Sequence, residues 1–212
     1  MAKLTFFVTT STCYAAIETA HDCIHDTYVL GQESQSAALI PFIKTLWDRA
    51  GNPQLTTLIA PKGPGSFTGI RVTLATAQGL SLAFPTATCF APTFFDVLLY
   101  GRPDESYAII DSKRGDYFVQ TKTGTPLILT PDDFLSFHQT HKDWTVIVEP
   151  ELTGSNFMSQ NNIHPICYEP EQLLNALLAV ETYAQPEVEA SVFAPYYLFE
   201  PTFKKTAEIL MR

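Results

Sequence analysis

A glycine-rich turn at residues 63–71 is the stretch whose residue types and spacing could do chemistry. Three of the ten glycines in the chain, Gly63, Gly65 and Gly69, fall inside it. An apolar, strand-like run at residues 56–60 leads into the turn, and a helix-like run to residue 83 leads out of it. Such a unit points backbone N–H groups and the positive helix end at one spot, where an anion can bind. The same geometry also serves simply to pack a helix closely against a sheet.

The spacing in the turn does not match two familiar phosphate-binding templates. A Walker loop has Lys and then Ser or Thr after its last glycine, whereas Ile70 and Arg71 follow Gly69 here. In a dinucleotide fingerprint the third glycine comes one residue earlier than it does here. Spacing alone therefore favours a packing role, in which Ser66 or Thr68 caps the helix by accepting an N–H bond.

Other residues that could do chemistry have plainer explanations. His21, Cys23 and His25 alternate along one face of a predicted strand, which spreads them too far for compact tetrahedral zinc binding. Ser66 has no His and carboxylate near it in sequence to complete a nucleophilic triad. The paired basic residues are expected to be solvated, and two histidines beside a predicted helix end suit the negative helix terminus. These residues are Lys113, Arg114, Lys204, Lys205, His138 and His141.

Composition indicates a folded, acidic globule. Hydrophobic residues make up 46% of the chain and charged residues 17%, and the net charge is -9. This charge repels a phosphate backbone, so we do not expect the chain to bind nucleic acid unaided. Residues 72–95 carry no charge, but Pro85 and Pro92 interrupt them, so a membrane helix is not expected. We expect a cytoplasmic protein whose four scattered cysteines are free, buried thiols.

The hydrophobic periodicity predicts an α/β protein with mixed sheets. Three sequential strands followed by alternating helices and strands imply a mixed sheet with helices packed on it. The polar, breaker-rich residues 101–105 predict a domain boundary. Strands are predicted at 4–8, 13–18, 23–30, 56–60, 87–90, 107–111, 117–121 and 144–148, helices at 36–50, 68–83, 92–100, 131–137 and 170–183, and a packed aromatic tail at 194–199.

The residues from Gly63 to Arg71 closely resemble the signature of the TsaB family, also called YeaZ. The resemblance extends to residues 77–80, 111–117 and 195–198, and it is thin between 122 and 190. It implies the actin-like, Hsp70-like ATPase fold, built from two ribonuclease-H-like domains. We expect these domains at residues 1–102, which carry the turn and the interface helices, and 103–212, which carry the aromatic tail.

The resemblance also implies a function. TsaB-like proteins are regarded as scaffold subunits that pair with a catalytic paralogue, TsaD. With the ATPase TsaE they place a threonylcarbamoyl group on the adenosine beside the tRNA anticodon. We therefore expect a TsaD-like and a TsaE-like partner, with a homodimer as the alternative assembly. Contact with tRNA is expected only through the complex, which is also where ATP is expected to bind, and no cofactor of the chain's own and no membrane contact are expected.

Two positions argue against metal-dependent catalysis by this chain alone. Thr9 stands at the end of the first strand, where TsaB-like sequences usually keep an Asp, and Gln35 replaces a His common at the start of the first helix. A hydroxyl brings no charge to offset a divalent cation. We therefore assign no catalytic and no metal-binding residue, and we expect no activity from the chain alone. An independent ATPase or hydrolase of the same fold is the alternative.

The turn itself is assigned a structural role, with a nucleotide-proximal role as the other possibility. Its glycines suit close backbone packing, and its hydroxyls suit helix capping. The residues that carry this assignment are Gly63, Pro64, Gly65, Ser66, Phe67, Thr68, Gly69 and Arg71.

Two helices predict a partner surface. The helix at 68–83 has no charge after Arg71, and its small residues Ala75, Gly79 and Ala83 recur every fourth position, which permits close approach of another helix. The helix at 36–50 is apolar on more than one side, and TsaB-like proteins pair through these two helices. The alternative is that the second domain or the tail covers both. The predicted partner face comprises Leu39, Ile43, Leu46, Trp47, Val72, Ala75, Thr76, Gly79 and Ala83.

Overall fold

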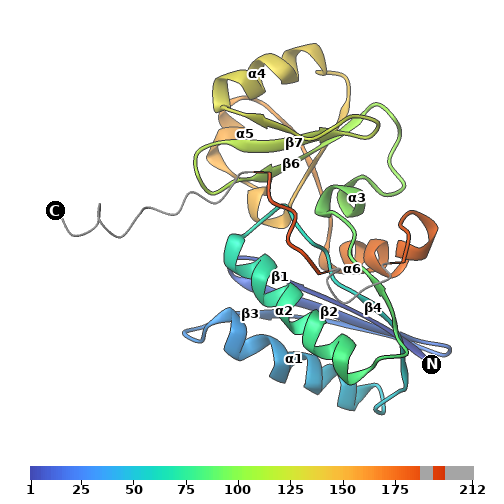
Figure 1. Ribbon diagram of the computed structural model, residues 1–212. Coiled ribbons are helices and arrows are strands. Elements are labelled where there is room, and N and C mark those ends of the chain that lie inside the picture. The colour runs from blue at the N-terminus through green and yellow to red at the C-terminus, as the bar shows by residue number, and fades with distance from the viewer. Residues whose placement is uncertain (187–192, 199–212) are drawn as a thin grey trace.

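The computed structural model describes residues 1–186 and 193–198, and it contains two five-stranded mixed sheets (Figure 1). The first sheet has the order β3-β2-β1-β4-β5, with β1, β2 and β3 antiparallel and β4 and β5 parallel to β1. Its strands are Ala2–Val8 (β1), Thr12–Thr19 (β2), Cys23–Val29 (β3), Leu55–Ile59 (β4) and Thr88–Phe90 (β5).

The second sheet repeats this topology in the order β8-β7-β6-β9-β10. Its first three strands are antiparallel neighbours, and β9 and β10 follow in parallel. They are Ser106–Asp111 (β6), Tyr117–Thr121 (β7), Leu127–Leu129 (β8), Thr145–Val148 (β9) and Ile166–Cys167 (β10). Each half of the chain therefore builds the same sheet.

Helices form three layers around the two sheets (Figure 1). Helices α1 (Gln35–Arg49) and α2 (Phe67–Ala83) cover the outer face of the first sheet. Helices α4 (Pro131–Thr140) and α5 (Asn156–Gln160) cover the outer face of the second. Between the sheets lie α3 (Phe94–Leu99) and α6 (Pro170–Leu178), and short 3₁₀ turns occur at Pro150–Leu152 (η1) and Val180–Thr182 (η2).

Strand β1 is covered by helices on both of its faces. Leu4, Phe6 and Val8 pack with α1 and α2, whereas Phe7 points to the opposite side and packs with α3 and α6. The end of β1 at residues 6–8 is accordingly apolar without alternation, whereas Lys3 and Thr5 interrupt the apolar pattern earlier in the strand.

Helix α6 joins the two halves. It follows the last strand of the second sheet, yet it packs against β1, β2 and β3 of the first. Its buried Leu173, Leu174 and Leu177 share one core with Ile59 of the first sheet and Ile147 of the second. The strands divide on either side of residue 102, because β5 ends at Phe90 and β6 begins at Ser106. The domain boundary itself stays a prediction.

The predicted strands and helices are confirmed with small shifts at their ends, except that the helix predicted at 170–183 ends at Leu178 and is followed by η2. The elements β8, α5 and β10 are additional. In the aromatic tail, Phe193 is buried and Tyr196 N donates to Lys62 O at 2.7 Å, while Phe199, Lys204 and Lys205 lie outside the described residues. All four cysteines are free, but only Cys13 is buried, which corrects the expectation of buried thiols. The helices of the described segments are too short or too polar to span a bilayer.

Candidate functional site

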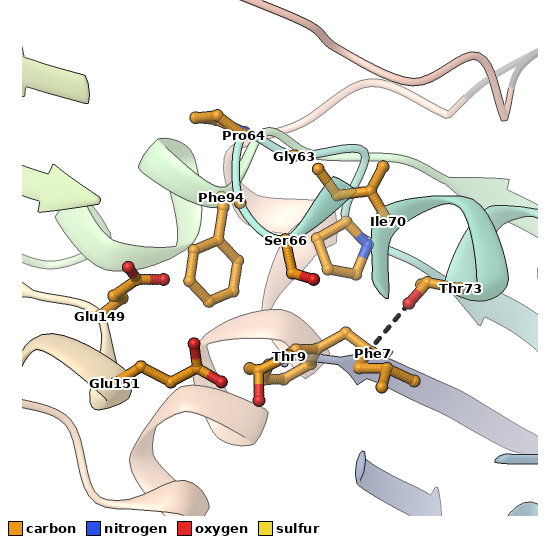
Figure 2. Close-up of a pocket in the computed structure, with 13 residues that line it drawn as sticks. Phe7, Thr9, Gly63, Pro64, Ser66, Ile70, Thr73, Phe94, Glu149 and Glu151 are labelled. Carbon is orange, nitrogen blue, oxygen red and sulfur yellow. Dashed lines mark hydrogen bonds between the residues drawn. The ribbon is translucent and has the colours of Figure 1, made fainter. Parts of the chain in front are cut away.

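The candidate site is the cleft between the two halves, where the glycine turn faces the end of β9 (Figure 2). Thr9, Gly63 and Ser66 line it from the first half, and Glu149 and Glu151 line it from the second. The cleft holds a cavity of about 30 Å³, which is room for about two water molecules. A second pocket of about 200 Å³ shares Pro64, Gly65 and Ile70 with this cavity and is also lined by Lys113 and Tyr197.

The glycine turn packs helix α2 against the end of β1. A Cβ on Gly69 would lie 2.2 Å from the carbonyl oxygen of Val8, closer than any real Cβ contact. Gly63 has a φ of +106°, and a Cβ there would meet the side chain of Ile70 at 2.8 Å. Ser66 caps the helix, because its side chain accepts from Gly69 N at 3.3 Å. The contacts of this turn are therefore those of close packing and capping.

The other residues of the turn divide between the cleft and the surface. Pro64 is buried and lines the cleft together with Gly65, and the peptide bond that joins Gly63 to Pro64 is cis (Figure 2). Phe67 and Thr68 are exposed in the first turn of α2. Pro64 and Gly65 thus belong to the wall of the cleft, and a nucleotide-proximal role for the turn stays a prediction.

Thr9 and Gln35 are in direct contact, which the sequence did not predict. Gln35 Nε2 donates to the backbone oxygen of Thr9 at 2.5 Å. The Thr9 hydroxyl donates to Thr12 O at 3.3 Å and accepts from Thr12 N at 3.2 Å. Both side chains are thus used to shape the turn between β1 and β2, and neither brings a charge to it.

Two carboxylates that the sequence argument missed complete the site. Glu149 and Glu151 directly follow β9, which runs parallel to β6, so both lie at the edge of the sheet where parallel strands end. Glu149 is only 5% exposed and accepts from Asp111 N at 2.8 Å. An acidic pair immediately after the apolar run 145–148 was the signal that could have found them.

The surroundings of Glu149 favour its neutral form. Burial raises its pKa to about 7, against opposing contributions from the Asp111 N–H and the Lys113 charge. The nearby charges of Glu151 and Asp111 contribute to this rise. Glu149 therefore exchanges its proton near neutral pH, which is a property shared by general acids and bases and by buried structural carboxyls.

Glu151 is held in its charged form. Burial works against that charge, but hydrogen bonds from Thr9 and Thr10 and the ammonium group of Lys113 outweigh it and lower the pKa of Glu151. Lys113 Nζ lies 3.3 Å from Glu151 and 3.3 Å from Asp111. The expectation that Lys113 is merely solvated is therefore wrong, because it is an ion-pair partner inside the site.

The outer face of α2 presents small and apolar side chains to solvent. Ala75, Gly79 and Ala83 are exposed, and Leu82 is 72% exposed. A Cβ on Gly79 would meet no atom within 4 Å. Val72 and Thr76 are half-buried at the edge of this stripe.

Helix α1 contributes less to an accessible surface than the sequence indicated. Leu39, Ile43 and Leu46 are buried against the protein's own sheet, so a partner cannot contact them in this conformation. The physical reason is that these residues form the core-facing stripe of an amphipathic helix. Trp47 is half-buried, and its ring centroid lies 5.7 Å from that of Phe84. Ile40 is a large hydrophobic residue of α1 that is exposed, at 48%.

The start of α2 holds the last described segment of the chain. Arg71 Nε donates to Tyr197 Oη at 2.9 Å, and its guanidinium carbon lies 3.9 Å from the centroid of the Phe67 ring. The rings of Phe67 and Tyr197 stack at 5.5 Å. Phe67 and Arg71 therefore bind the chain's own tail in this structure.

The histidines do not form a second centre. Cys23 and His25 are exposed on β3, and His21 is exposed in the turn before it. Within residues 1–186 and 193–198 no three His, Cys, Asp or Glu side chains gather closely enough to hold a metal ion. His138 Nδ1 lies 2.7 Å from the Tyr107 hydroxyl, and burial together with His141 lowers the pKa of His138. A cationic role for His138 at the helix end is thus disfavoured.

Comparisons with known proteins establish the fold. No family model matches the chain, and no curated protein matches it at a significant level. The structure of YeaZ from Pseudomonas aeruginosa superposes with a TM-score of 0.68 at 22% identity, covering 93% of this chain and 99% of that one. An uncharacterized protein with similarity to peptidase YeaZ from Pseudomonas aeruginosa gives a TM-score of 0.70 at 20% identity, with coverages of 93% and 99%. The chain has the fold of these proteins, which confirms the predicted actin-like fold class.

Proposed function

We propose that this chain is a member of the YeaZ (TsaB) family and acts as a non-catalytic scaffold subunit. In this role it binds a TsaD-like catalytic paralogue of the same fold and, with a TsaE-like ATPase, serves threonylcarbamoyl transfer to tRNA. The family signature at residues 63–71 and the fold shared with YeaZ support this assignment.

The observation that carries the proposal is the outer face of α2. Its residues from Val72 to Ala83 carry no charge, and Ala75, Gly79, Leu82 and Ala83 are all exposed. A helix whose solvent face is small and apolar is suited to helix–helix packing with a second protein. The partner face that we now propose is this stripe, with Ile40 of α1 beside it, and it leaves out the buried Leu39, Ile43 and Leu46.

An independent ATPase or hydrolase has less support from the cleft. The cavity beside Thr9 and Ser66 measures about 30 Å³, which is room for about two waters. The hydroxyls that line it, those of Thr9, Ser66 and Thr73, are all engaged in hydrogen bonds within the protein. ATP turnover by the purified chain would favour this alternative, and the scaffold proposal expects none.

Gly79→Arg tests the interface. Because the position opens to solvent, the substitution leaves the fold of the monomer intact while placing a large charge in the stripe. We expect the complex with the TsaD-like paralogue to weaken at least tenfold by isothermal titration calorimetry and to be lost in size-exclusion chromatography. Reconstituted threonylcarbamoyl transfer should fall in parallel.

Gln139→Arg is the matched control, since Gln139 is an exposed polar residue on α4, on the outer layer of the other half. Equal affinity of both variants and the unaltered chain would contradict the interface. If Gly79→Arg instead changes the mass of the chain alone from dimer to monomer, the stripe is a homodimer surface.

A further inference from the structure

Glu151 links the two halves of the molecule across the mouth of the cleft. From η1 in the second half, its Oε1 accepts from the backbone N–H of Thr10 at 2.8 Å and of Ser11 at 3.3 Å in the first half. Its Oε2 lies 3.3 Å from Lys113 Nζ. Figure 2 shows the carboxylate pointing across the cleft at Thr9.

The groups around this carboxylate form an anion site. Two successive backbone N–H groups in a turn make a concave site for oxyanions. Lys113 adds a positive charge beside Glu151 Oε2. The Ser11 hydroxyl lies 3.5 Å from Glu151 Oε1, the oxygen that accepts from the two backbone N–H groups. An external phosphate or carboxylate would need these same donors.

Lys113 is fixed in place for this role. Its backbone has a φ of +57°, which is uncommon for a residue with a side chain, and Asp111 stabilises that conformation by accepting from Lys113 N at 2.6 Å. Asp111 also pairs with Lys113 Nζ at 3.3 Å. Removal of Glu151 therefore does not leave Lys113 without an anionic partner, and a variant at this position can keep its fold.

We propose that Glu151 is an internal ligand that closes the cleft to external anions. Its carboxylate occupies the two N–H donors of the β1–β2 turn and so competes with any phosphate-class ligand for them. The same side chain links η1 and Lys113 to the first half. This autoinhibitory contact goes beyond the scaffold function and does not depend on which partner the α2 stripe binds.

The test uses the full chain and inorganic phosphate as the probe. Backbone amide signals of Thr10 and Ser11 are followed by nitrogen–proton NMR during a phosphate titration of the unaltered protein, Glu151→Ala and Glu171→Gln. Glu171 is the matched control, because it also reaches from the second half of the chain to the first, lying 3.7 Å from His25, but contacts no amide of this turn.

Three results are expected. The substitution of Glu151 moves both amide protons upfield and speeds their exchange with solvent at least about tenfold, since charge-assisted hydrogen bonds are lost. Phosphate then shifts both signals saturably in Glu151→Ala and leaves them unmoved in the unaltered protein. Glu171→Gln behaves as the unaltered protein does.

The proposal is overturned if Glu151→Ala leaves the two amides unshifted, because the contact is then absent in solution. It is also overturned if phosphate fails to bind Glu151→Ala, or binds the unaltered protein equally well. Glu151→Gln guards against a folding defect: it keeps an oxygen acceptor but loses the charge, so its amide shifts should be intermediate. Binding of Gly79→Arg to the TsaD-like paralogue is measured in a separate experiment. The α2 interface and the Glu151 contact can therefore each be refuted without the other.

Discussion

Glu149 and Glu151 are two residues apart, yet their surroundings move their acidities in opposite directions. Glu149 is buried with one backbone N–H donor, and its pKa is raised to about 7. Glu151 meets two turn amides and Lys113, and its pKa is lowered. The site therefore holds one carboxyl group that is half-protonated near neutral pH and one that is fully charged.

Glu149→Gln should remove a pH dependence of stability. The folded protein holds a proton on Glu149 up to about pH 7, whereas the unfolded chain releases it near 4.5. The stability that this group contributes is complete below 4.5 and is lost as the pH rises to about 7, by on the order of 3 kcal/mol. Urea unfolding at pH 5 and pH 8 measures the difference.

The glutamine side chain keeps the acceptor for Asp111 N but does not titrate, so the variant should show a flatter profile than the unaltered protein. Glu105→Gln, at an exposed position, serves as the control. Equal slopes for Glu149→Gln and the unaltered protein would show that Glu149 is charged in the folded state.

At the residue scale, the sequence predicted the residues of the glycine turn but not the two glutamates that face them across the cleft. Thr9 and Gln35 were identified separately, as two positions without a charged metal ligand, and the hydrogen bond that joins them was not predicted. Glu149 and Glu151 were missed, because the site forms between halves that lie far apart in the chain. Neither local spacing nor the family signature contains that contact.

At the scale of elements, α2 is anchored to β1 through both backbone groups of one residue, Val8. Gly69 passes directly over the carbonyl oxygen of Val8, and Val8 N donates to the buried Thr73 hydroxyl at 3.0 Å. Gly69 is thus the residue at which α2 contacts β1. This anchoring also sets which side of α2 faces solvent.

Gly69→Ala should destabilise the protein by about 2–3 kcal/mol, because a Cβ at 2.2 Å from a backbone oxygen forces the helix away from the strand. Gly79→Ala in the same helix is the control, since its Cβ meets open space. It should be neutral or stabilising by about 0.5–1 kcal/mol. Chemical denaturation measures both, and similar effects at the two positions would refute this packing role.

Periodicity was sufficient to predict the long elements, since each has a clear apolar stripe or run. It was insufficient for β8, α5 and β10, which are 3, 5 and 2 residues long and carry too few residues to show a period. It also assigned the stripe of Leu39, Ile43 and Leu46 to a partner. One sequence does not distinguish an apolar face that covers its own sheet from one that awaits another protein.

At the scale of the whole molecule, the core between the two sheets is built from residues of both halves. Helices α3 and α6 lie between the sheets, and α6 is the element by which the second half completes the first (Figure 1). We expect a single unfolding transition. The two tryptophans report on it separately, because Trp47 packs on the outer side of the first sheet and Trp144 on that of the second.

Leu177→Ala should destabilise both halves together. Leu177 is fully buried in the shared core, so its truncation should cost about 2–5 kcal/mol. Single-tryptophan proteins carrying Trp47→Phe or Trp144→Phe should show the same shift of the urea midpoint. Leu82→Ala, at an exposed site, should change stability by less than about 0.5 kcal/mol. Separate transitions for the two probes would mean that the halves unfold independently.

The return of α6 to the first sheet has a consequence during synthesis. The face of that sheet formed by Phe7, Tyr14 and Ile59 is covered by α6, whose residues leave the ribosome more than 110 positions after β4 ends. The first half therefore emerges with an apolar surface that it cannot bury by itself. While the second half is being translated, this surface is the place where a nascent-chain chaperone would bind, and release would follow the docking of residues 170–178.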